Sequence, residues 1–175
     1  MSIPYTVTGT ATNGNDFLIS TKGNDTISGN NGNDIIFVGK GDDYIHGGPG
    51  NDKLFGDSGD DLLSGGKGTD MLTGGSGHDT FVFGRDCGVD KVTDFQHSST
   101  TKDTLDISDI QRNYNPATEA LSDFVKFTGN ADGTCTMKVN ADGHGSSFHD
   151  VAVISFNLSA LSVDSLVADG ALVVT

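Results

Sequence analysis

The chain has 175 residues and a formal net charge of −14, with 24 acidic side chains against 10 Lys and Arg. This balance excludes nucleic acid and anionic membranes as favoured partners, because both are bound through Lys and Arg that displace counterions. Every acidic residue except Glu119 is an Asp, and Asp favours turns and short-range coordination of cations.

The two cysteines, Cys87 and Cys135, are too few for a disulfide framework and lack the paired spacing of a structural zinc site. The sequence leaves open whether they pair with each other or stay free thiols. The N-terminus shows no charged and apolar leader, and no apolar run reaches about 18 residues. We therefore expect neither a cleaved signal peptide nor direct insertion into a membrane.

After a tail or link over residues 1–10, a nine-residue period governs residues 11–83. Its mark is the triplet Gly-x-Asp, which recurs eight times without slippage, each time followed two residues later by a large apolar side chain, from Leu18 to Phe81. A disordered Asp- and Gly-rich linker would not keep an apolar residue in register. We therefore expect folded repeats.

Each position of the repeat has a physical role. Glycines permit a tight turn and a close approach of backbone carbonyls, and the Asp places an anionic oxygen at the end of the turn. The last three residues form a short strand whose middle, apolar side chain points inward. Two units complete a coil, so unit n stacks on unit n + 2. Eight units give six stacked pairs, and we expect about six Ca²⁺ ions between them.

The predicted ligands are carboxylates and backbone carbonyls of the Gly-x-Asp triplets. The carboxylates are those of Asp16, Asp25, Asp34, Asp43, Asp52, Asp61, Asp70 and Asp79. The carbonyls are those of Gly32, Gly41, Gly50, Gly59, Gly68 and Gly77.

The full unit GGxGxDxUx is met at 47–55, 65–73 and 74–82. This pattern resembles the repeats-in-toxin (RTX) family, whose nonapeptides form calcium-binding β-rolls. The resemblance covers residues 11–82. It implies an all-β fold, a parallel β-roll capped by a mostly antiparallel C-terminal segment with short helices over residues 84–175.

The outward residues of the two faces of the roll differ. In the odd-numbered units six of eight outward positions are apolar, while polar residues prevail on the even face. The apolar set is Phe17, Ile19, Ile35, Phe37, Phe55 and Met71. Such a patch is normally covered, and we expect the C-terminal segment to pack over it. An oligomer or a neighbouring domain is the competing cover.

Beyond the repeats, FVFGRDCGVDKVTDF (81–95) and DTLDISDI (103–110) resemble the run that follows the repeats in many type I secreted proteins. Four Asp residues in these runs either add a further ion or cap helix ends, and the sequence leaves both interpretations open. They are Asp90, Asp94, Asp103 and Asp106.

Capping and turn signals divide the C-terminal segment further. Asn115-Pro116 predicts a helix near 116–122, and Asn130-Ala131-Asp132-Gly133 predicts a hairpin turn. A second turn at 140–143 leads to a strand within 151–156, and these strands form an antiparallel sheet.

A short helix at 163–168, stopped by Gly170, leaves 171–174 as a terminal strand. An apolar end after a short helix looks like the C-terminal target region of type I secretion substrates. That resemblance implies a type I transporter as a partner and export to the medium or the bacterial cell surface without a signal peptide.

Catalytic patterns are absent from the sequence. Neither GxSxG nor HExxH occurs, and a single Glu gives no general acid/base pair. His144 and His149, with Asp142 and Asp150, suggest a transition-metal site, but the alternative of solvated histidines in a Gly/Ser-rich loop is favoured. We expect a protein that is not an enzyme.

The leading hypothesis is a calcium-dependent folding and secretion module at the C-terminus of a larger extracellular protein, an adhesin. It would stay unfolded in the low-calcium cytosol and fold on calcium outside. The alternative is an accessory module of a secreted lipase, metalloprotease or alginate epimerase, with a polysaccharide as a further partner.

Overall fold

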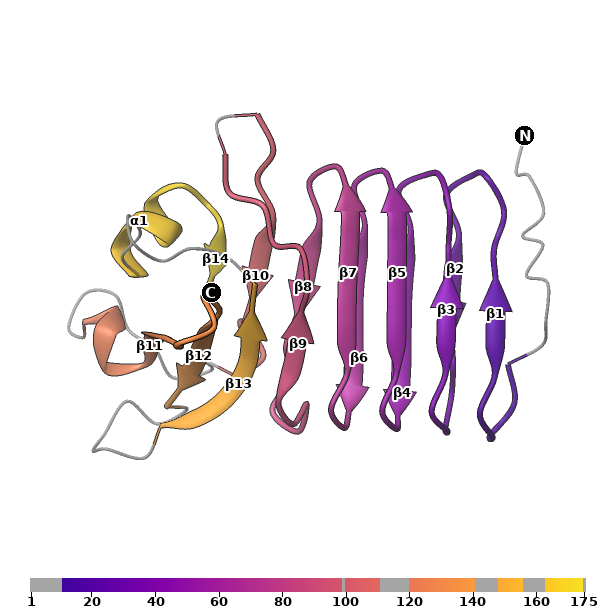
Figure 1. Cartoon of the computed structure of the whole chain (residues 1–175), viewed down its shortest axis with the longest axis horizontal. Coiled ribbons are helices and arrows are strands. Elements are labelled where there is room, and N and C mark those ends of the chain that lie inside the picture. The colour runs from indigo at the N-terminus through magenta and orange to yellow at the C-terminus, as the bar shows by residue number, and fades with distance from the viewer. Residues whose placement is uncertain (1–10, 99, 111–119, 141–147, 156–162, 175) are drawn as a thin grey trace.

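A computed structural model describes residues 11–98, 100–110, 120–140, 148–155 and 163–174. The fold is nearly all β: an elongated roll of repeat coils with the C-terminal segment stacked on one end (Figure 1). The repeats contribute β1 (Phe17–Ile19), β2 (Thr26–Ser28), β3 (Ile35–Phe37), β4 (Tyr44–Pro49), β5 (Lys53–Ser58), β6 (Leu62–Lys67), β7 (Met71–Ser76) and β8 (Thr80–Val82).

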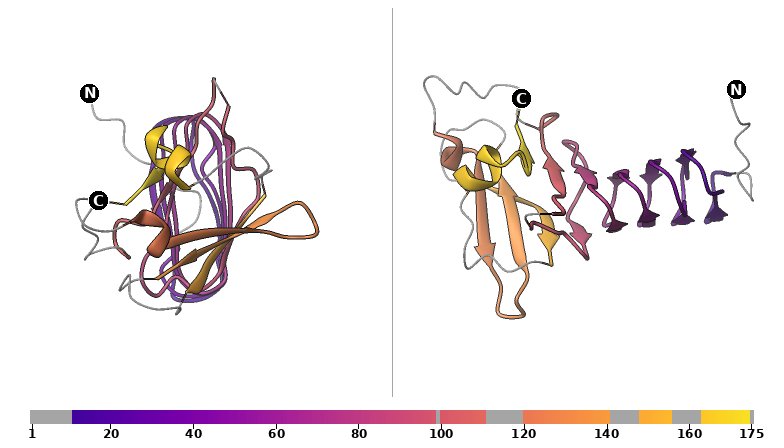
Figure 2. Two further views of the ribbon diagram at one scale, coloured as in Figure 1. Left: turned by 90° about the vertical axis from the view of Figure 1, so that its left-hand side faces the viewer. Right: turned by 90° about the horizontal axis from the view of Figure 1, so that it is seen from above.

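The predicted stacking of unit n on unit n + 2 is confirmed. Ile36 pairs with Leu18 on one side and with Leu54 on the other, always in parallel and in steps of 18 residues. Seen along the roll, the coils superpose as a flattened oval of two facing sheets (Figure 2). Strands β4 to β7 are longer than the three residues expected, because the ladder continues into the glycine pair, where Gly48 pairs with Gly66.

The apolar column fills the space between the two sheets. Its members are at most 3% exposed: Leu18, Ile27, Ile36, Ile45, Leu54, Leu63, Leu72 and Phe81. Stacked coils lie only one strand spacing apart. The fourth position of each turn therefore has no room for a side chain. A Cβ added to Gly50, whose φ is 151°, would lie 1.7 Å from the Gly32 carbonyl oxygen, so glycine is required there.

The C-terminal segment extends both sheets beyond the repeats. Its elements are β9 (Asp90–Val92), β10 (Thr104–Asp106), the 3₁₀ helix η1 (Leu121–Asp123), β11 (Val125–Gly129), β12 (Cys135–Val139), β13 (His149–Ile154), α1 (Val163–Ala168) and β14 (Leu172–Val173). One sheet runs β1-β3-β5-β7-β9-β13-β12-β11, and the other runs β14-β10-β8-β6-β4-β2.

Most of the expected C-terminal elements are present. The hairpin β11–β12 and its antiparallel partner β13 are confirmed, as are α1 and a terminal strand after Gly170, whose φ is 74°. Of the helix expected near 116–122, the structure shows η1, while 111–119 lie outside the described residues, as does the turn at 141–143. The boundary at residue 83 stays a prediction.

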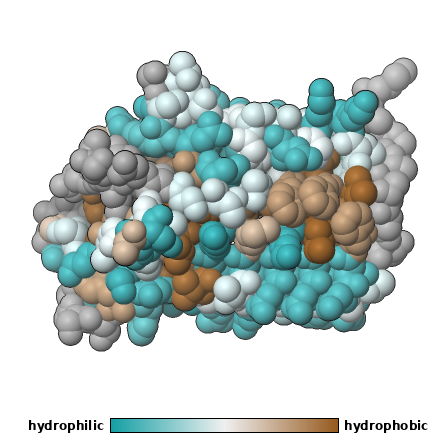
Figure 3. All heavy atoms as spheres, in the orientation of Figure 1, coloured by the Kyte–Doolittle hydropathy of each residue, from teal (hydrophilic) through white to brown (hydrophobic). Residues whose placement is uncertain are grey.

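The expected cover of the odd face is wrong for the described part of the C-terminal segment. That segment continues the sheet at its far end through β9 and β13 instead of packing over its outer face. Phe17 is 58% exposed and Ile19 44% exposed, and Figure 3 shows the resulting apolar patch over β1, β3 and β5. Phe37 stacks on Phe55 at 4.4 Å between ring centroids, so these rings shield each other along the ladder.

Cys87 and Cys135 are free thiols, both buried. Burial raises the pKa of each thiol to about 12, so both are neutral at physiological pH. Within the described ranges, no helix has the length and apolar character needed to cross a bilayer.

Candidate metal centre

The Asp residues of the repeats form two columns that run along the axis of the roll, one on each edge. In each column the backbone N–H of one Asp donates to Oδ1 of the Asp one coil later. The distances are 2.7 Å from Asp34 to Asp52 and 2.7 Å from Asp52 to Asp70. Asp25, Asp43, Asp61 and Asp79 form the second column in the same way. The structure thus brings all eight predicted carboxylates into two ladders.

The second oxygen of most of these carboxylates is buried and has no hydrogen-bond partner. Seven such Oδ2 atoms occur among the described residues: those of Asp34, Asp43, Asp52, Asp61, Asp70, Asp79 and Asp90. All seven side chains are at most 3% exposed. A buried carboxylate oxygen without a partner costs several kcal/mol, unless a proton or a cation satisfies it.

For five of the seven unpartnered oxygens, those of Asp34, Asp52, Asp61, Asp70 and Asp79, a glycine at the first position of the turn leaves open the space beside the oxygen. A Cβ added to Gly29 would lie 2.2 Å from Oδ2 of Asp34 and 2.6 Å from the carbonyl oxygen of Gly47, one coil later. Gly47 has the same relation to Asp52 and Gly65. A side chain would fill this cradle, which carboxylate and carbonyl oxygens line.

The sequence prediction placed the carbonyl ligands at the fourth position of the turn, from Gly32 to Gly77. The structure brings the carbonyls of the first position, such as Gly47 and Gly65, next to the unpartnered oxygens. The carbonyl of Gly32 instead faces the Cα of Gly50. The role of the fourth-position carbonyls as ligands stays a prediction.

Burial and mutual repulsion raise the pKa values of the Asp columns. The pKa of Asp52 is raised to about 6, and those of Asp61 and Asp79 to about 7, chiefly by burial and then by neighbouring Asp charges. Burial likewise raises the pKa of Asp34 and Asp43. In the absence of a bound cation, burial therefore disfavours the charged form of these carboxylates.

The first coil differs from the others. Asp16 accepts hydrogen bonds from Thr12, including one of 2.6 Å from its backbone N–H. Asp25 accepts hydrogen bonds from Ser20 and Thr21. Although burial acts to raise the pKa of Asp25, these hydrogen bonds lower it overall. The residues that replace the glycine pair thus satisfy both carboxylates of the first coil.

Two carboxylates beyond the repeats continue the ladders. Asp90 Oδ1 accepts the N–H of Asp70 at 3.0 Å, and Asp103 Oδ1 accepts that of Asp79 at 3.1 Å. The nine-residue period misses them because they follow their partners by 20 and 24 residues instead of 18. A signal was present: Gly88-Val89-Asp90-Lys91-Val92 keeps the pattern Gly-x-Asp-x-apolar after a two-residue insertion.

Asp94 and Asp106 have a different role. Asp94 accepts hydrogen bonds from the backbone N–H groups of Gly74 and Gly75, at 3.0 and 2.8 Å. Asp106 accepts one from Ser108 at 2.9 Å. Both carboxylates therefore accept hydrogen bonds from backbone donors, but neither lies at an end of a described helix, so the expectation that they cap helix ends is not confirmed.

A second polar ladder runs beside the first, and the sequence interpretation missed it. At the fifth position of the turn, the Asn15 side chain accepts the N–H of Asn33, and the Asn33 side chain accepts that of Asn51, both at 2.8 Å. Asp42 and Asp60 act likewise on the other edge. The Asn or Asp at this position is therefore structural, since its side chain links successive coils.

The arrangement fits a hard cation. The oxygens nearest to the first-position glycines belong to carboxylates and carbonyls, the ligands that Ca²⁺ prefers. Among the residues with described structure, no three His, Cys, Asp or Glu side chains are grouped to hold a metal. Asp150 pairs with Lys138 at 2.6 Å. His144 and Asp142 of the suggested transition-metal site lie outside the described residues.

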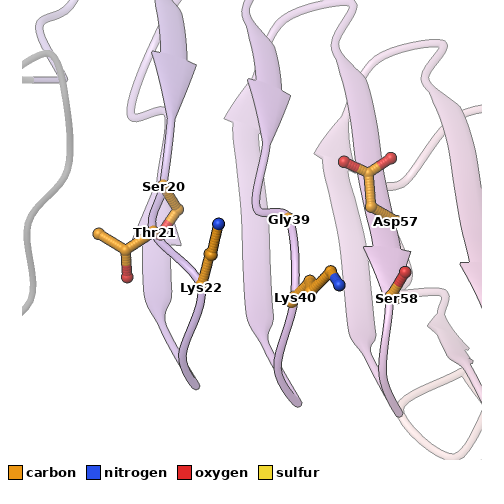
Figure 4. A pocket seen from close by; sticks show the side chains of 7 residues that line it. All are labelled: Ser20, Thr21, Lys22, Gly39, Lys40, Asp57 and Ser58. Carbon is orange, nitrogen blue, oxygen red and sulfur yellow. The ribbon is translucent and has the colours of Figure 1, made fainter.

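A shallow groove crosses the even-numbered turns near the start of the roll. It encloses about 680 Å³ and is lined by Lys22, Lys40, Asp57 and Ser58, among others. Figure 4 shows the two lysine side chains on adjacent coils, 18 residues apart. Lys40 and Ser58 are joined by a parallel bridge, so these turns stack in register.

Comparisons with known proteins agree with this geometry. Two solution structures of subunits of the Azotobacter vinelandii mannuronan C5-epimerase are similar. The AlgE6R3 subunit has a TM-score of 0.51 and 25% identity, with 94% of this chain and 84% of that chain covered. The AlgE6R2 subunit has a TM-score of 0.50 and 28% identity, with 84% and 89% covered.

A looser similarity, with a TM-score of 0.35 and 16% identity, extends to the extracellular lipase LipA from Serratia marcescens and covers 94% of this chain and 39% of that one. No curated protein sequence matches the chain. The family model for the RTX calcium-binding nonapeptide repeat matches residues 10–45 and 46–81. This segment therefore matches the RTX calcium-binding nonapeptide repeat and is folded as a parallel β-roll.

Proposed function

We propose that the chain is a calcium-dependent folding module of a larger extracellular protein, with a C-terminal region that directs type I secretion. One observation carries the proposal: the seven buried carboxylate oxygens without a hydrogen-bond partner. They make the folded roll unfavourable until cations bind. Calcium binding and folding are then one equilibrium, because the cradles exist only in the folded coil.

This coupling supports export. In a cytosol low in calcium, the stacked Asp side chains within each column would repel one another, and burial of the narrow apolar column would not offset the loss of chain entropy. The chain would then stay unfolded and could thread a transporter. Outside the cell, calcium reaches the range of about 10⁻⁴–10⁻³ M at which extracellular modules bind it. Folding then follows secretion. The apolar end after α1 is the proposed transporter signal.

The test is circular dichroism of the purified chain during a calcium titration. We expect a cooperative transition from coil to β structure, and magnesium should fail because it demands a tighter octahedral shell. A spectrum that stays the same from exhaustive chelation to millimolar calcium would contradict the proposal. For the secretion role, deletion of the last residues from α1 onward should abolish export from a type I secretion host while leaving the calcium transition of the repeats in place.

A polysaccharide-binding role is the second candidate. The groove carries the positively charged side chains of Lys22 and Lys40 on adjacent coils. Bound calcium would offset much of the net charge of −14. The similar structures come from an enzyme that acts on mannuronan. A polyuronate is therefore the proposed ligand, and a secreted enzyme would be the parent protein. An adhesin is the parent expected if no polyuronate binds.

A pull-down on immobilised polyuronate with calcium present separates the two parents. The double variant Lys22→Glu with Lys40→Glu should lose binding. The matched control, Lys53→Glu with Lys91→Glu, changes the charge equally on the odd-numbered face and should retain it. Equal binding by both double variants would remove the groove from consideration, and no binding by the unmodified chain would favour the adhesin.

A further inference from the structure

The two Asp columns have four ends among the described residues, and three of them are closed by hydrogen bonds. Asp16 and Asp25 are satisfied by Thr12 and by Ser20 with Thr21. At the other end of the second column, Asp103 Oδ2 accepts the backbone N–H of Gln96 at 2.7 Å. These three carboxylates therefore need no further ligand.

The fourth end, at Asp90, is open. Its Oδ1 accepts the N–H of Asp70, but its Oδ2 is buried without a hydrogen-bond partner. The side chain is only 1% exposed. The backbone around it has the geometry of a repeat turn, since a Cβ added to Gly88 would lie 1.8 Å from the Gly68 carbonyl oxygen. Asp90 thus occupies the ligand position of a further turn.

Among the described residues, no basic side chain forms an ion pair with Asp90. Arg85 is exposed and donates to the carbonyl oxygen of Asp109 at 3.3 Å, and Lys67 pairs with Asp86 at 3.2 Å. Cys87 is a buried neutral thiol. A thiol is a poor ligand for hard cations, and it binds soft cations only after it has lost its proton. Asp70, the closest partner in the column, is itself a buried carboxylate with an unpartnered oxygen.

We propose that the Asp90 carboxylate, together with that of Asp70, binds a Ca²⁺ ion at the junction between the repeats and the C-terminal segment. This site lies outside the nonapeptide pattern, which the family model matches only to residue 81. The inference rests on the proposed calcium-dependent folding and extends it to the C-terminal segment.

The position of the ion has a structural consequence. Asp90 begins β9, which pairs with β7 of the repeats through Lys91 and Val92 and with β13 of the C-terminal segment through Ala152 to Ile154. β9 is therefore the strand that joins the roll to the hairpin. An ion at Asp90 fixes the start of that strand, so calcium orders the junction as well as the repeats.

The test compares Asp90→Asn with Asp86→Asn in the full chain. Both variants remove one charge near the junction, but Asp86 is exposed and pairs with Lys67 instead of lying in an Asp column. The first readout is the number of Ca²⁺ ions bound per chain at saturating calcium, measured by equilibrium dialysis with metal analysis. The second is the alkylation rate of Cys87, resolved by mass spectrometry, with the buried Cys135 of β12 as internal comparator.

Asp90→Asn should bind one Ca²⁺ fewer than the unmodified chain, and Cys87 should be alkylated about tenfold faster or more, as local opening of the junction requires. Asp86→Asn should keep both the ion count and the protection of Cys87. An unchanged ion count in Asp90→Asn would overturn the proposal, as would equal loss in the two variants.

Failure of the proposed function is recognised separately. In that case the unmodified chain binds no calcium at all, whereas failure of the junction site alone leaves its binding intact. If Asp90→Asn does not fold, Asp90→Glu retains the charge but displaces the carboxylate by one methylene. A weakened last binding step in Asp90→Glu supports the site, and a calcium titration that matches the unmodified chain at every step counts against it.

Discussion

The roll and the C-terminal segment that carries the β11–β12 hairpin, here called the hairpin segment, bury polar groups in different ways, although they share both sheets. In the roll, each coil contributes two apolar side chains to the column and one Asp to each ladder. In the hairpin segment, apolar side chains from several elements pack together, among them Phe124, Met137 and Leu166. The buried polar side chain of Thr136 is hydrogen-bonded there to Asn130. The buried Thr136 thus has a partner within the hairpin segment, whereas the roll leaves buried carboxylate oxygens without one.

Removal of calcium should have the largest effect and should divide the molecule at this boundary. When free calcium is at 100 times its Kd, each bound ion contributes about 2.7 kcal/mol to the free energy of unfolding. The loss of several ions therefore removes as much free energy as the typical stability of a domain, about 5–15 kcal/mol. Hydrogen exchange resolved by peptide should show complete loss of protection in β3 to β8. Peptides of β11 and β12 should lose less, and uniform loss across both regions would remove the distinction.

A side chain at the fourth position of a turn should have the next largest effect. Gly50→Ala forces a positive φ on Ala and places its Cβ against the Gly32 carbonyl, which should destabilise the calcium-bound roll by about 3 kcal/mol or more. Gly133→Ala is the control, because it has φ of 84° but open space around it. It should cost about 1–2 kcal/mol. Urea unfolding at fixed calcium measures both values.

Acid should partly replace calcium. In the unfolded chain, Asp titrates near its ordinary pKa of 3.8, whereas in the calcium-free roll burial raises the pKa of Asp52 to about 6 and those of Asp61 and Asp79 to about 7. Protonation therefore favours the folded state. The stabilisation is fully present below about pH 3.8 and is lost as pH rises through 6 to 7.

Circular dichroism of the chelated chain should accordingly show more β structure at pH 5 than at pH 8. Near-ultraviolet dichroism and dye binding serve as controls that separate an ordered roll from a molten globule. Less β structure at pH 5 than at pH 8 would contradict the idea that unpartnered carboxylates keep the roll unfolded.

The smallest effect is expected at the first coil. Thr12→Val removes the hydroxyl that donates to Asp16 but keeps the backbone hydrogen bond, so the calcium-bound chain should lose only about 0.5–1.5 kcal/mol. The number of bound ions should not change. Thr26→Val, on an exposed strand position, is the control and should be close to neutral in thermal unfolding.

Much of the roll could be predicted because its period is rigid. An 18-residue coil and an inward apolar column follow directly from glycine, Asp and Leu or Ile at fixed spacing. The carbonyl positions could not be assigned, because the direction of a peptide group in the turn depends on how the next coil packs on it. Gly47 illustrates this, since its role appears only once Asp34 lies against it.

The C-terminal segment was harder to predict for a different reason. Its strands join the roll through pairings that no local signal encodes, such as β13 with β9 and β14 with β10. The insertion before Gly88 broke the period and concealed Asp90 as a member of the ladder. The described part of the C-terminal segment does not cover the odd face as predicted, because the sequence shows that a patch exists, but not that Phe37 and Phe55 shield each other by stacking.

The parallel register of the coils has a consequence for length. Each coil takes 18 residues, which span roughly 60 Å when extended but add only about 4.8 Å to the axis once stacked. Coiling therefore shortens the polypeptide more than tenfold along its own direction. If the chain is exported through a narrow channel as proposed, with calcium on one side only, each coil that closes beyond the exit would draw tens of ångströms of chain after it. Ion binding would then be converted into directed movement.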